Sequence, residues 1–343
     1  MNRMEAARAR ARLNAAIRAF FAEAGYDEVE TPCMVPAPGM EPHIDAFQTT
    51  FVPEGGGPGR PLWLHTSPEY AMKRLLADGW ERIFQLARVF RNGEVSASHN
   101  PEFTMLEFYR TPGDHRTIMA DLEALVERGA RTLSPSGSTK VRRPGGELDL
   151  AAPFERLTVA DAFERLAGID LPACQGDARL LRQAAAERGV PMGPEGESFD
   201  DVFFRVFLER IEPGLGVARP TYLVDWPVSM AALARLEPQG RWAERFELYA
   251  GGLELANGFA ELNDAAEQRR RLVEEQALRA RLGRPAYPLD ESFLEAVGRM
   301  PPAGGVAVGL DRLLMLLVGA ASIEEVLLFP AQGFVNTRSH SPR

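Results

Sequence analysis

The segment over residues 82–110 constrains the fold most, because its pattern predicts two strands that return on each other through a polar loop. The run IFQLARVF ends just before Arg91, and the run EFTMLEFYR follows the loop NGEVSASHNP. Successive side chains of a strand point to opposite faces of its sheet. We therefore expect Leu106 and Phe108 to face the core. Four alternate residues would share the opposite, open face: Phe103, Met105, Glu107 and Tyr109.

The residues of that open face favour ligand binding over burial. A buried face would carry aliphatic residues at alternate positions, whereas this one carries aromatic rings, a carboxylate and, beyond the first strand, Arg91. A solvated sheet face is the alternative interpretation. Aromatic rings between charged groups suit the stacking of a planar ligand better than they suit water.

Size and charge exclude several classes of protein. The 343 residues, 45% of them hydrophobic, are enough for one large or two medium domains. No apolar run approaches the roughly 20 residues of a membrane span, and the first residues do not resemble a signal peptide, so we expect a cytoplasmic protein. A net charge of -9 opposes extended binding to nucleic acid. Cys33 and Cys174 lack a metal-ligand pattern and are expected to be buried thiols.

The first part of the chain predicts a helix, a bend and a second helix. Apolar residues at helical spacing predict an amphipathic helix that stops near Gly25, and Pro32 predicts a fixed bend before a loop rich in proline and glycine. A strand over residues 62–65 leads into Ser67-Pro68-Glu69. This triplet offers a hydroxyl cap and a first-turn proline for a helix that reaches about Gly79.

The middle of the chain predicts a helical insertion. We expect a helix over residues 114–131, a turn-rich connection over residues 132–150 and several helices over residues 159–211. Breaks between these helices are expected at Pro172, Gly189 and Pro194. We expect one domain over residues 1–333, with residues 114–215 as the connecting and helical insertion, and a polar tail over residues 334–343.

A second hairpin is predicted around Gly251-Gly252, since two alternating runs flank this glycine pair. Pairing about the turn would set Glu247 opposite Ala256 and diagonal to Glu254. Diagonal neighbours lie about 7–8 Å apart, a distance over which two carboxylates can converge on a divalent cation. The alternative is that each carboxylate meets an arginine.

Two further polar residues of this hairpin, Asn257 and Glu261, have the opposite parity from Glu254. They join the same pocket only if the strand bulges between them, and Gly258 is the expected place for a bulge. Without a bulge, both side chains would lie on the surface.

Residues 304–309, GGVAVG, predict a strand of small residues that runs into the buried helix LDRLLMLLV. Small side chains let a ligand approach the backbone closely. Arg312 would then lie in the first turn of the helix and point toward that ligand.

Together these segments resemble the three motifs of class II aminoacyl-tRNA synthetases, most closely the lysyl branch. The matching stretches are TSPEYAMKRLL, HNPEFTMLEFYR, GLELANGFAELND and GLDRLLMLL. The resemblance implies an α+β fold in which helices flank an antiparallel sheet, and a homodimer built partly on the segment around Pro32. It also implies activation of an amino acid by ATP with Mg²⁺.

The resemblance also implies residue roles. Arg91 would bridge the ATP α-phosphate and the substrate carboxylate, a bidentate task that suits guanidinium. Phe103 and Arg312 would sandwich adenine, and Glu247 with Glu254 would hold magnesium, so the catalytic set is Arg91, Glu247, Glu254 and Arg312. The implied ATP-binding residues are Arg91, Asn92, Gly93, His99, Asn100, Phe103, Glu247, Leu248, Gly309 and Arg312. The implied substrate-binding residues are Ser67, Pro68, Glu69, Glu107, Tyr109, Glu254, Asn257, Glu261 and Ala307.

The acceptor is expected to be a protein and not transfer RNA. The first motif begins in the opening helix, without the anticodon-binding domain that precedes it in lysyl-tRNA synthetases, and the chain is acidic. In this respect it is similar to the shortened paralogues that ligate (R)-β-lysine to a lysine of elongation factor P. Ala307 stands where lysyl-tRNA synthetases typically have glycine, and its methyl group could disfavour α-lysine. The alternative is that Ala307 is merely another small strand residue.

One departure from the family pattern concerns adenine. The family commonly has Arg-Asn-Glu where this chain has Arg91-Asn92-Gly93-Glu94, so the adenine contact would fall to Glu94 or to the backbone of Gly93. Two other functions stay open. One is a stand-alone lysine-activating enzyme with a tRNA or another acceptor, and the other is a non-catalytic regulatory paralogue.

Overall fold

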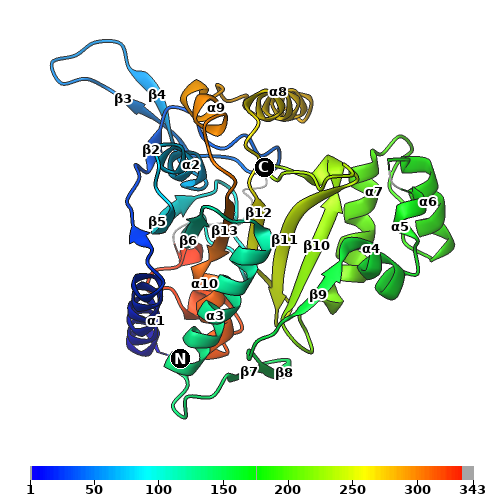
Figure 1. The fold of residues 1–343 in the computed structure, drawn as a ribbon, viewed down its shortest axis with the longest axis horizontal. Helices are drawn as coiled ribbons and strands as arrows, with labels where there is room; N and C mark the ends of the chain where they lie inside the picture. The colour runs from blue at the N-terminus through cyan, green and yellow to red at the C-terminus, as the bar shows by residue number, and fades with distance from the viewer. Residues whose placement is uncertain (1, 175, 334–343) are drawn as a thin grey trace, which may run out of the picture.

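The computed structural model describes residues 2–174 and 176–333, so the expected polar tail lies outside the described residues. An eight-stranded sheet forms its centre, in the order β1-β5-β6-β13-β12-β11-β10-β9 (Figure 1). The two edge pairs, β1 with β5 and β9 with β10, are parallel, and all other neighbours are antiparallel. The strands are β1 Asp27–Glu28, β5 Arg82–Phe90, β6 Glu102–Arg110, β9 Glu155–Thr158, β10 Thr221–Pro227, β11 Trp242–Ala250, β12 Leu253–Ala260 and β13 Gly304–Gly309.

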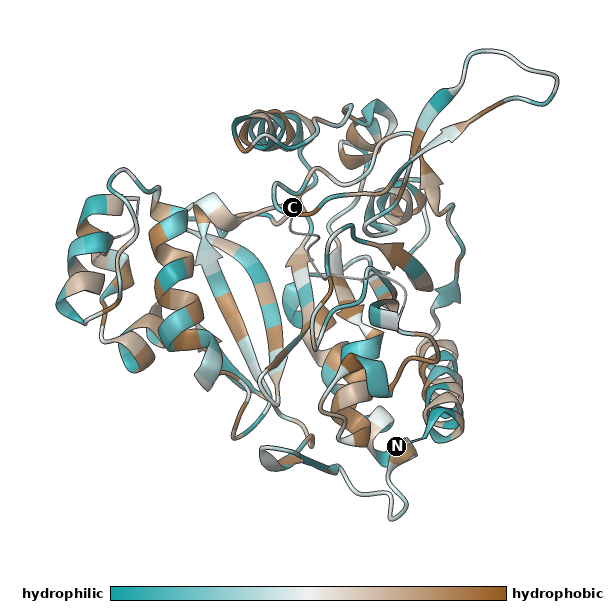
Figure 2. Cartoon of the chain, turned by 180° about the vertical axis from the view of Figure 1, so that it is seen from behind, coloured by the Kyte–Doolittle hydropathy of each residue, from teal (hydrophilic) through white to brown (hydrophobic). Residues whose placement is uncertain are grey.

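Three helices cover one face of this sheet and form the main core with it. They are α1 Arg3–Glu23, α3 His115–Leu133 and α10 Leu310–Val318. Leu106 and Phe108 are fully buried in this core, which confirms the parity expected for β6. The long strands alternate between hydrophobic and hydrophilic residues, visible as coloured bands in Figure 2. The expected α+β fold, with helices flanking an antiparallel sheet, is confirmed.

Smaller elements cover the opposite face near β5 and β6. Helix α2 Glu69–Ala77 packs on this face through Met72 and Leu76, which contact Ile83 and Tyr109. Beside α2 lie α8 Ala265–Arg281, α9 Glu291–Val297 and a sheet in the order β2-β4-β3 (Figure 1). Its strands are β2 Met34–Val35, β3 Gln48–Phe51 and β4 Arg60–Leu64.

The helices expected over residues 159–211 follow β9 and precede β10 along the chain, and they form a second core with this edge of the sheet. Pro172 does not break a helix, because it lies inside α5, and the chain turns instead at Gly168, whose φ is 68°. The elements are α4 Val159–Ala162, the π-helix η1 Phe163–Ala167, α5 Leu171–Cys174, α6 Ala178–Glu187, α7 Phe199–Val206, the π-helix η2 Phe207–Ile211 and the 3₁₀-helix η3 Glu212–Gly214. The division of the chain at about 114–215 stays a prediction.

The structure corrects two other expectations. The stretch expected to be only turn-rich contains the hairpin of β7 Lys140–Arg143 and β8 Gly146–Asp149, because Val141 and Leu148 alternate with polar residues and are buried. Cys33 is exposed, whereas Cys174 is buried as expected. The remaining 3₁₀-helices are η4 Val228–Met230, η5 Ile323–Glu325 and η6 Ala331–Gly333. Over the described ranges, no helix has the length and apolar character needed to cross a membrane.

Replacing Leu106 by alanine tests the core. Leu106 is 0% exposed, so Leu106→Ala leaves a cavity and is expected to lower the free energy of unfolding by about 2–5 kcal/mol. Val273→Ala on α8 is the control, because Val273 is 46% exposed and its loss is expected to stay within about 0.5 kcal/mol. Urea denaturation measures both. Equal losses in the two variants would contradict the assigned core.

Candidate active site

A row of side chains crosses the sheet on the face opposite the main core. The register pairs Gln85 of β5 with Glu107 of β6, Glu107 with Ala307 of β13, Ala307 with Asn257 of β12, and Asn257 with Glu247 of β11. Paired residues in neighbouring strands project to the same side. The two hairpins and the glycine-rich strand therefore place their polar residues on one surface.

The register corrects the pairing expected for the second hairpin. Glu247 lies opposite Asn257 and not opposite Ala256, because β12 contains a bulge at Leu255. The bulge expected at Gly258 does not occur there. Glycine is needed at position 258 for a different reason: a Cβ atom there would lie 2.7 Å from the carbonyl oxygen of Gly305 on the neighbouring strand, too close for a side chain. The extra residue at 255 reverses the parity and brings Asn257 to the face that carries Glu254.

Glu107 is the most buried acid of this face. Its carboxylate accepts hydrogen bonds from Ser67 Oγ and from the hydroxyl of Tyr109 at 3.0 Å. Burial, then the charge of Glu69, raises the pKa of Glu107 to about 8. The expected open face is therefore closed here: Glu107 is 0% exposed and Tyr109 is 3% exposed, because α2 packs over this end of β6.

Lys73, which sequence reasoning missed, lies within the same pocket. Its Nζ is 2.6 Å from Glu69 Oε1 and 2.6 Å from Glu261 Oε2. Burial acts to lower the pKa of Lys73, but the two carboxylates outweigh it and hold the pKa above its usual value. The available signal was its position four residues after Glu69 on one helix, the spacing of an ion pair. With Glu107, the pocket contains three carboxyl groups and one internal ammonium group.

Arg91 and Phe103 lie at the other end of the first hairpin. The guanidinium carbon of Arg91 is 5.3 Å from the centroid of the Phe103 ring, and its Nη1 is 3.9 Å from Glu94 Oε1. Phe103 thus provides a flat stacking surface, as expected, and Arg91 lies over it. Gly93 has a φ of 87°, a conformation that only glycine adopts readily.

Arg312 of α10 holds the loop between β5 and β6 against β12. Its Nη1 is 2.9 Å from the carbonyl oxygen of Glu254 and 3.6 Å from Glu254 Oε2, and its Nη2 contacts His99 Nε2. Burial, then the charge of Arg312, lowers the pKa of His99 to about 4, and Arg91 acts in the same direction. His99 is therefore neutral at pH 7 and contacts Arg312, while the charge of Arg91 also acts on it.

Glu247 and Glu254 each lie beside an arginine, as in the alternative to a metal site that the sequence left open. Glu247 accepts hydrogen bonds at 2.6 Å from Arg245 and at 2.6 Å from the Tyr249 hydroxyl. Burial raises the pKa of Glu247 to about 7; Arg245 lowers it and Glu254 raises it. Residues 2–174 and 176–333 contain no cluster of three possible His, Cys, Asp or Glu ligands. A magnesium ion at this carboxylate pair would therefore share its coordination with phosphate oxygens, as Mg²⁺ commonly does.

Two residues expected to bind ATP have other contacts in the structure. The Asn100 amide donates to the carbonyl of Glu102 at 2.6 Å and accepts from the backbone N–H of Ala331 at 2.8 Å. The side chain of Leu248 lies in the main core, since its parity is opposite to that of Glu247, so only its backbone faces the site.

For three other expected site residues, Asn92, Pro68 and Gly309, the structure gives the position of the backbone. The backbone N–H of Asn92 donates to Asp45 at 2.7 Å. Pro68 and Gly309 are the N-cap residues of α2 and α10.

Comparison with known proteins defines the class. Residues 2–333 match the family described as tRNA synthetases class II (D, K and N), and the chain belongs to this family. Among its relatives is the elongation factor P–(R)-β-lysine ligase of Salmonella typhi. The two are 41% identical over 323 residues, which cover 93% of this chain and 93% of that protein. The resemblance drawn from the motifs is confirmed.

Glu107 is expected to make stability depend on pH. An unfolded glutamate ionises near 4.5, whereas folded Glu107 keeps its proton to about pH 8. Between these values the folded protein binds the extra proton, so the free energy of unfolding falls as pH rises, by at most about 1.4 kcal/mol per pH unit for this group. Glu107→Gln removes that contribution, and Glu274→Gln on the surface of α8 does not. Urea midpoints from pH 4.5 to 8 measure the slopes, and an unchanged slope in Glu107→Gln would refute the assignment.

Proposed function

We propose that the chain is a ligase that uses ATP to activate (R)-β-lysine and transfers the β-lysyl group to the ε-amino group of a lysine on elongation factor P. Membership of the class II family and the relative with this name support the proposal. The observation that carries it is the pocket of Glu69, Glu107 and Glu261, on the sheet face where Arg91 lies over Phe103 and Arg312 lies beside Glu254. An acidic pocket beside two arginines fits a diamino acid next to a nucleotide.

The acidic pocket is suited to ammonium groups. Ser67 and Tyr109 orient Glu107, and Lys73 orients Glu69 and Glu261, so the carboxylates are held before a substrate enters. Because Glu107 keeps its proton to about pH 8, the carboxylates of Glu69 and Glu261 together with the ammonium of Lys73 leave one net negative charge in the pocket at neutral pH. Such preorganised charges bind a cation without the cost of rearrangement.

The activation step needs alignment and charge stabilisation, and no covalent nucleophile. An oxygen of the β-lysine carboxylate attacks the α-phosphorus of ATP, and pyrophosphate leaves with the electrons of the broken bond. Arg91 would hold the attacking carboxylate and the α-phosphate together, and Phe103 with Arg312 would enclose adenine. Glu247 and Glu254 are the residues that would hold magnesium, whose charge supplies part of the neutralisation of the phosphate oxygens. The product is an acyl-adenylate.

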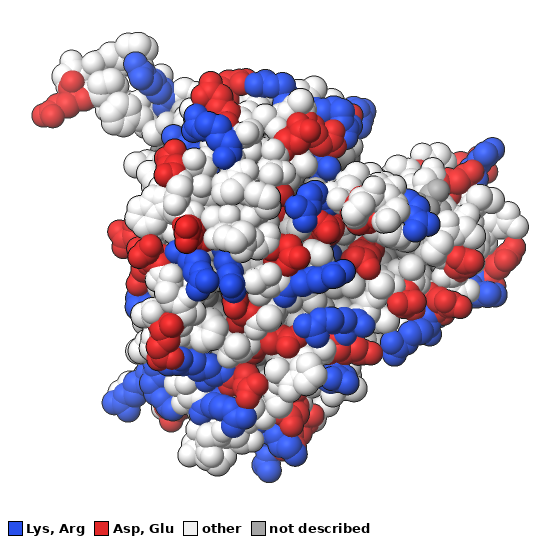
Figure 3. Space-filling model, in the orientation of Figure 1, with Lys and Arg blue, Asp and Glu red and all other residues white. Residues whose placement is uncertain are grey.

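The transfer step forms an amide bond. The neutral ε-amine of the acceptor lysine attacks the carbonyl carbon of the adenylate, AMP leaves, and the new amide nitrogen loses a proton. The net charge of -9 is consistent with a protein acceptor rather than a nucleic acid. Figure 3 shows acidic and basic side chains interspersed over the face drawn. Use of ATP and an elongation factor places the proposed reaction in the cytoplasm.

A homodimer is part of the proposal. A groove with a volume of about 750 Å³ lies between α1 and the segment 326–331, and many of its lining residues are apolar. Phe329 at this groove is 79% exposed. An exposed apolar groove beside the first helix is suited to a second copy of the chain.

The ligase activity is tested by pyrophosphate exchange and by the mass of elongation factor P. (R)-β-lysine is expected to support exchange and to add one β-lysyl group to the factor. Arg91→Lys loses the bidentate contact and is expected to lower kcat/KM by about 10²–10³-fold. Arg128→Lys, at a surface ion pair with Glu23, is the control and should stay within about twofold of wild type. Faster charging of transfer RNA, or no exchange with any lysine isomer, would overturn the proposal.

Ala307 is expected to select against α-lysine. It lies in the row between Asn257 and Glu107, so its methyl group faces the substrate side of the sheet. Ala307→Gly is expected to lower the preference for (R)-β-lysine over α-lysine by about 5- to 100-fold, since one methyl group contributes about 1–3 kcal/mol. The ratio of kcat/KM for the two substrates measures this, because losses of folded protein cancel in the ratio. An unchanged ratio would show that Ala307 is only a small strand residue.

A further inference from the structure

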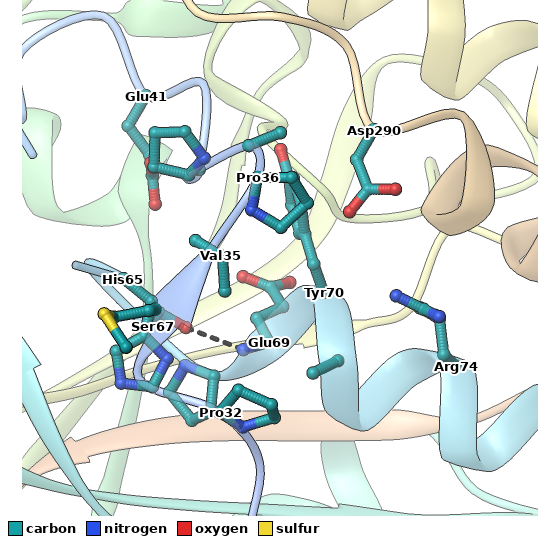
Figure 4. A pocket seen from close by; sticks show the side chains of 16 residues that line it. Pro32, Val35, Pro36, Glu41, His65, Ser67, Glu69, Tyr70, Arg74 and Asp290 are labelled. Carbon is teal, nitrogen blue, oxygen red and sulfur yellow. Dashed lines mark hydrogen bonds between the residues drawn. The ribbon is translucent and has the colours of Figure 1, made fainter. Parts of the chain in front are cut away.

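A further carboxylate lies opposite the first turn of α2, at a cavity that shares Ser67 and Glu69 with the proposed substrate pocket. A cavity of about 120 Å³ lies between α2 and the loop over residues 36–45, with Ser67, Glu69 and Tyr70 on one side and Glu41 on the other. Figure 4 shows Glu41 reaching toward this cavity from the loop, while Glu69 reaches toward it from the first turn of α2. Glu41 has no role in the mechanism above.

The carboxylate of Glu41 lacks a partner for one of its oxygens. Among residues 2–174 and 176–333, Oε2 of Glu41 is buried and has no hydrogen-bond partner. The carboxylate folds over Gly39, where a Cβ atom would collide with it. Burial raises the pKa of Glu41, and the nearby charge of Arg91 acts against this. A buried carboxyl oxygen without a partner is costly, so a cationic ligand would stabilise it.

The loop that carries Glu41 is held firmly in place. Arg279 of α8 is 0% exposed and donates to the carbonyl oxygens of Glu41 at 2.7 Å and Ile44 at 2.8 Å. Its Nη2 is 2.7 Å from Asp45 Oδ1, and its guanidinium carbon lies 4.2 Å from the centroid of the Tyr287 ring. A backbone fixed by so many contacts presents Glu41 at a set position, as a preorganised binding residue requires.

The charges of the pocket leave the second ammonium group of a diamino acid without a carboxylate partner, which Glu41 could supply. Lys73 already engages one oxygen of Glu69 and one of Glu261, and Glu107 lies beneath them. A diamino acid brings two ammonium groups, and the second needs a carboxylate of its own. The cavity that Glu41 lines also contains Ser67 and Glu69, which contact Glu107 and Lys73, and the charge of Arg91 acts on Glu41.

We propose that Glu41 determines substrate specificity by binding the amino group nearest the substrate carboxylate, the β-amino group of (R)-β-lysine. Glu107 and Glu261 would then bind the terminal amino group. This inference rests on the proposed function, because it assigns a residue to one end of the same substrate. Arg279 acts as a positioning residue through its contacts with the Glu41 backbone.

The experiment compares Glu41→Gln with Glu275→Gln. Glu275 lies on α8, and its pKa is raised to about 7 by burial and then by the charge of Glu41. It is a suitable control because it is not one of the described residues that line the cavity. Binding of three ligands is measured by calorimetry with a nonhydrolysable ATP analogue present: (R)-β-lysine, (R)-3-aminohexanoate and 6-aminohexanoate. Thermal unfolding checks that each variant folds, and Glu41→Ala serves as a second variant.

Glu41→Gln is expected to weaken (R)-β-lysine and (R)-3-aminohexanoate by about 10- to 100-fold, the effect of losing one charged hydrogen bond. Its affinity for 6-aminohexanoate and for the nucleotide should stay within about twofold of wild type, as should all affinities of Glu275→Gln. Equal weakening of all three ligands, weakening of 6-aminohexanoate alone, or no change would overturn the inference. If wild type binds (R)-β-lysine and supports no exchange with it, the proposed function fails while the role of Glu41 stands.

Discussion

The hydrogen-bond register of the central sheet is the constraint on which the site depends. Five strands, drawn from both ends of the chain, meet so that Gln85, Glu107, Ala307, Asn257 and Glu247 form one continuous row. A shift of one residue in any strand would send its side chain to the core instead. The single extra residue at Leu255 changes the parity of β12 part of the way along, so that Glu254 near Arg312 and Glu261 near Lys73 lie on the same face. The chemistry is therefore a product of strand pairing.

The burial of acids is what the proposed binding of cations rests on, and it also lowers the stability of the fold. Glu107, Glu247 and Glu261 are almost completely buried, and the pKa of each is raised by burial. Arg245, Lys73 and the hydroxyls of Ser67 and Tyr109 offset part of this cost by ion pairs and hydrogen bonds. The remaining negative charge awaits a ligand. Buried acids thus lower the free energy of unfolding at the residues proposed to bind the ligand, and functional sites in proteins commonly show this trade-off between stability and binding.

Local patterns in the sequence were enough to predict the parts of the site, but not all of their arrangement. Both hairpins, the helix after Asp114 and the strand before Arg312 follow from alternation, capping and glycine pairs, which act over a few residues. The bulge lies at Leu255 and was wrongly expected at Gly258, where Phe246 and Gly305 of the neighbouring strands leave no room for a Cβ atom. The closed pocket and the partners of Asn100 depend on α2 and on the segment near Ala331, which only the folded chain brings near.

The clamp formed by Arg279 would link a helix on the periphery to the proposed choice of substrate by Glu41. The Arg279 side chain binds a backbone carbonyl oxygen 238 positions away, so the shape of the proposed amino-acid pocket would be partly encoded in α8. Under this proposal, variation in α8 would change which amino acid is accepted and leave the proposed nucleotide site unchanged. Efforts to redirect the enzyme toward unnatural amino acids would therefore gain by diversifying the contact between α8 and the loop over residues 36–45, which lies outside the strands that form the row.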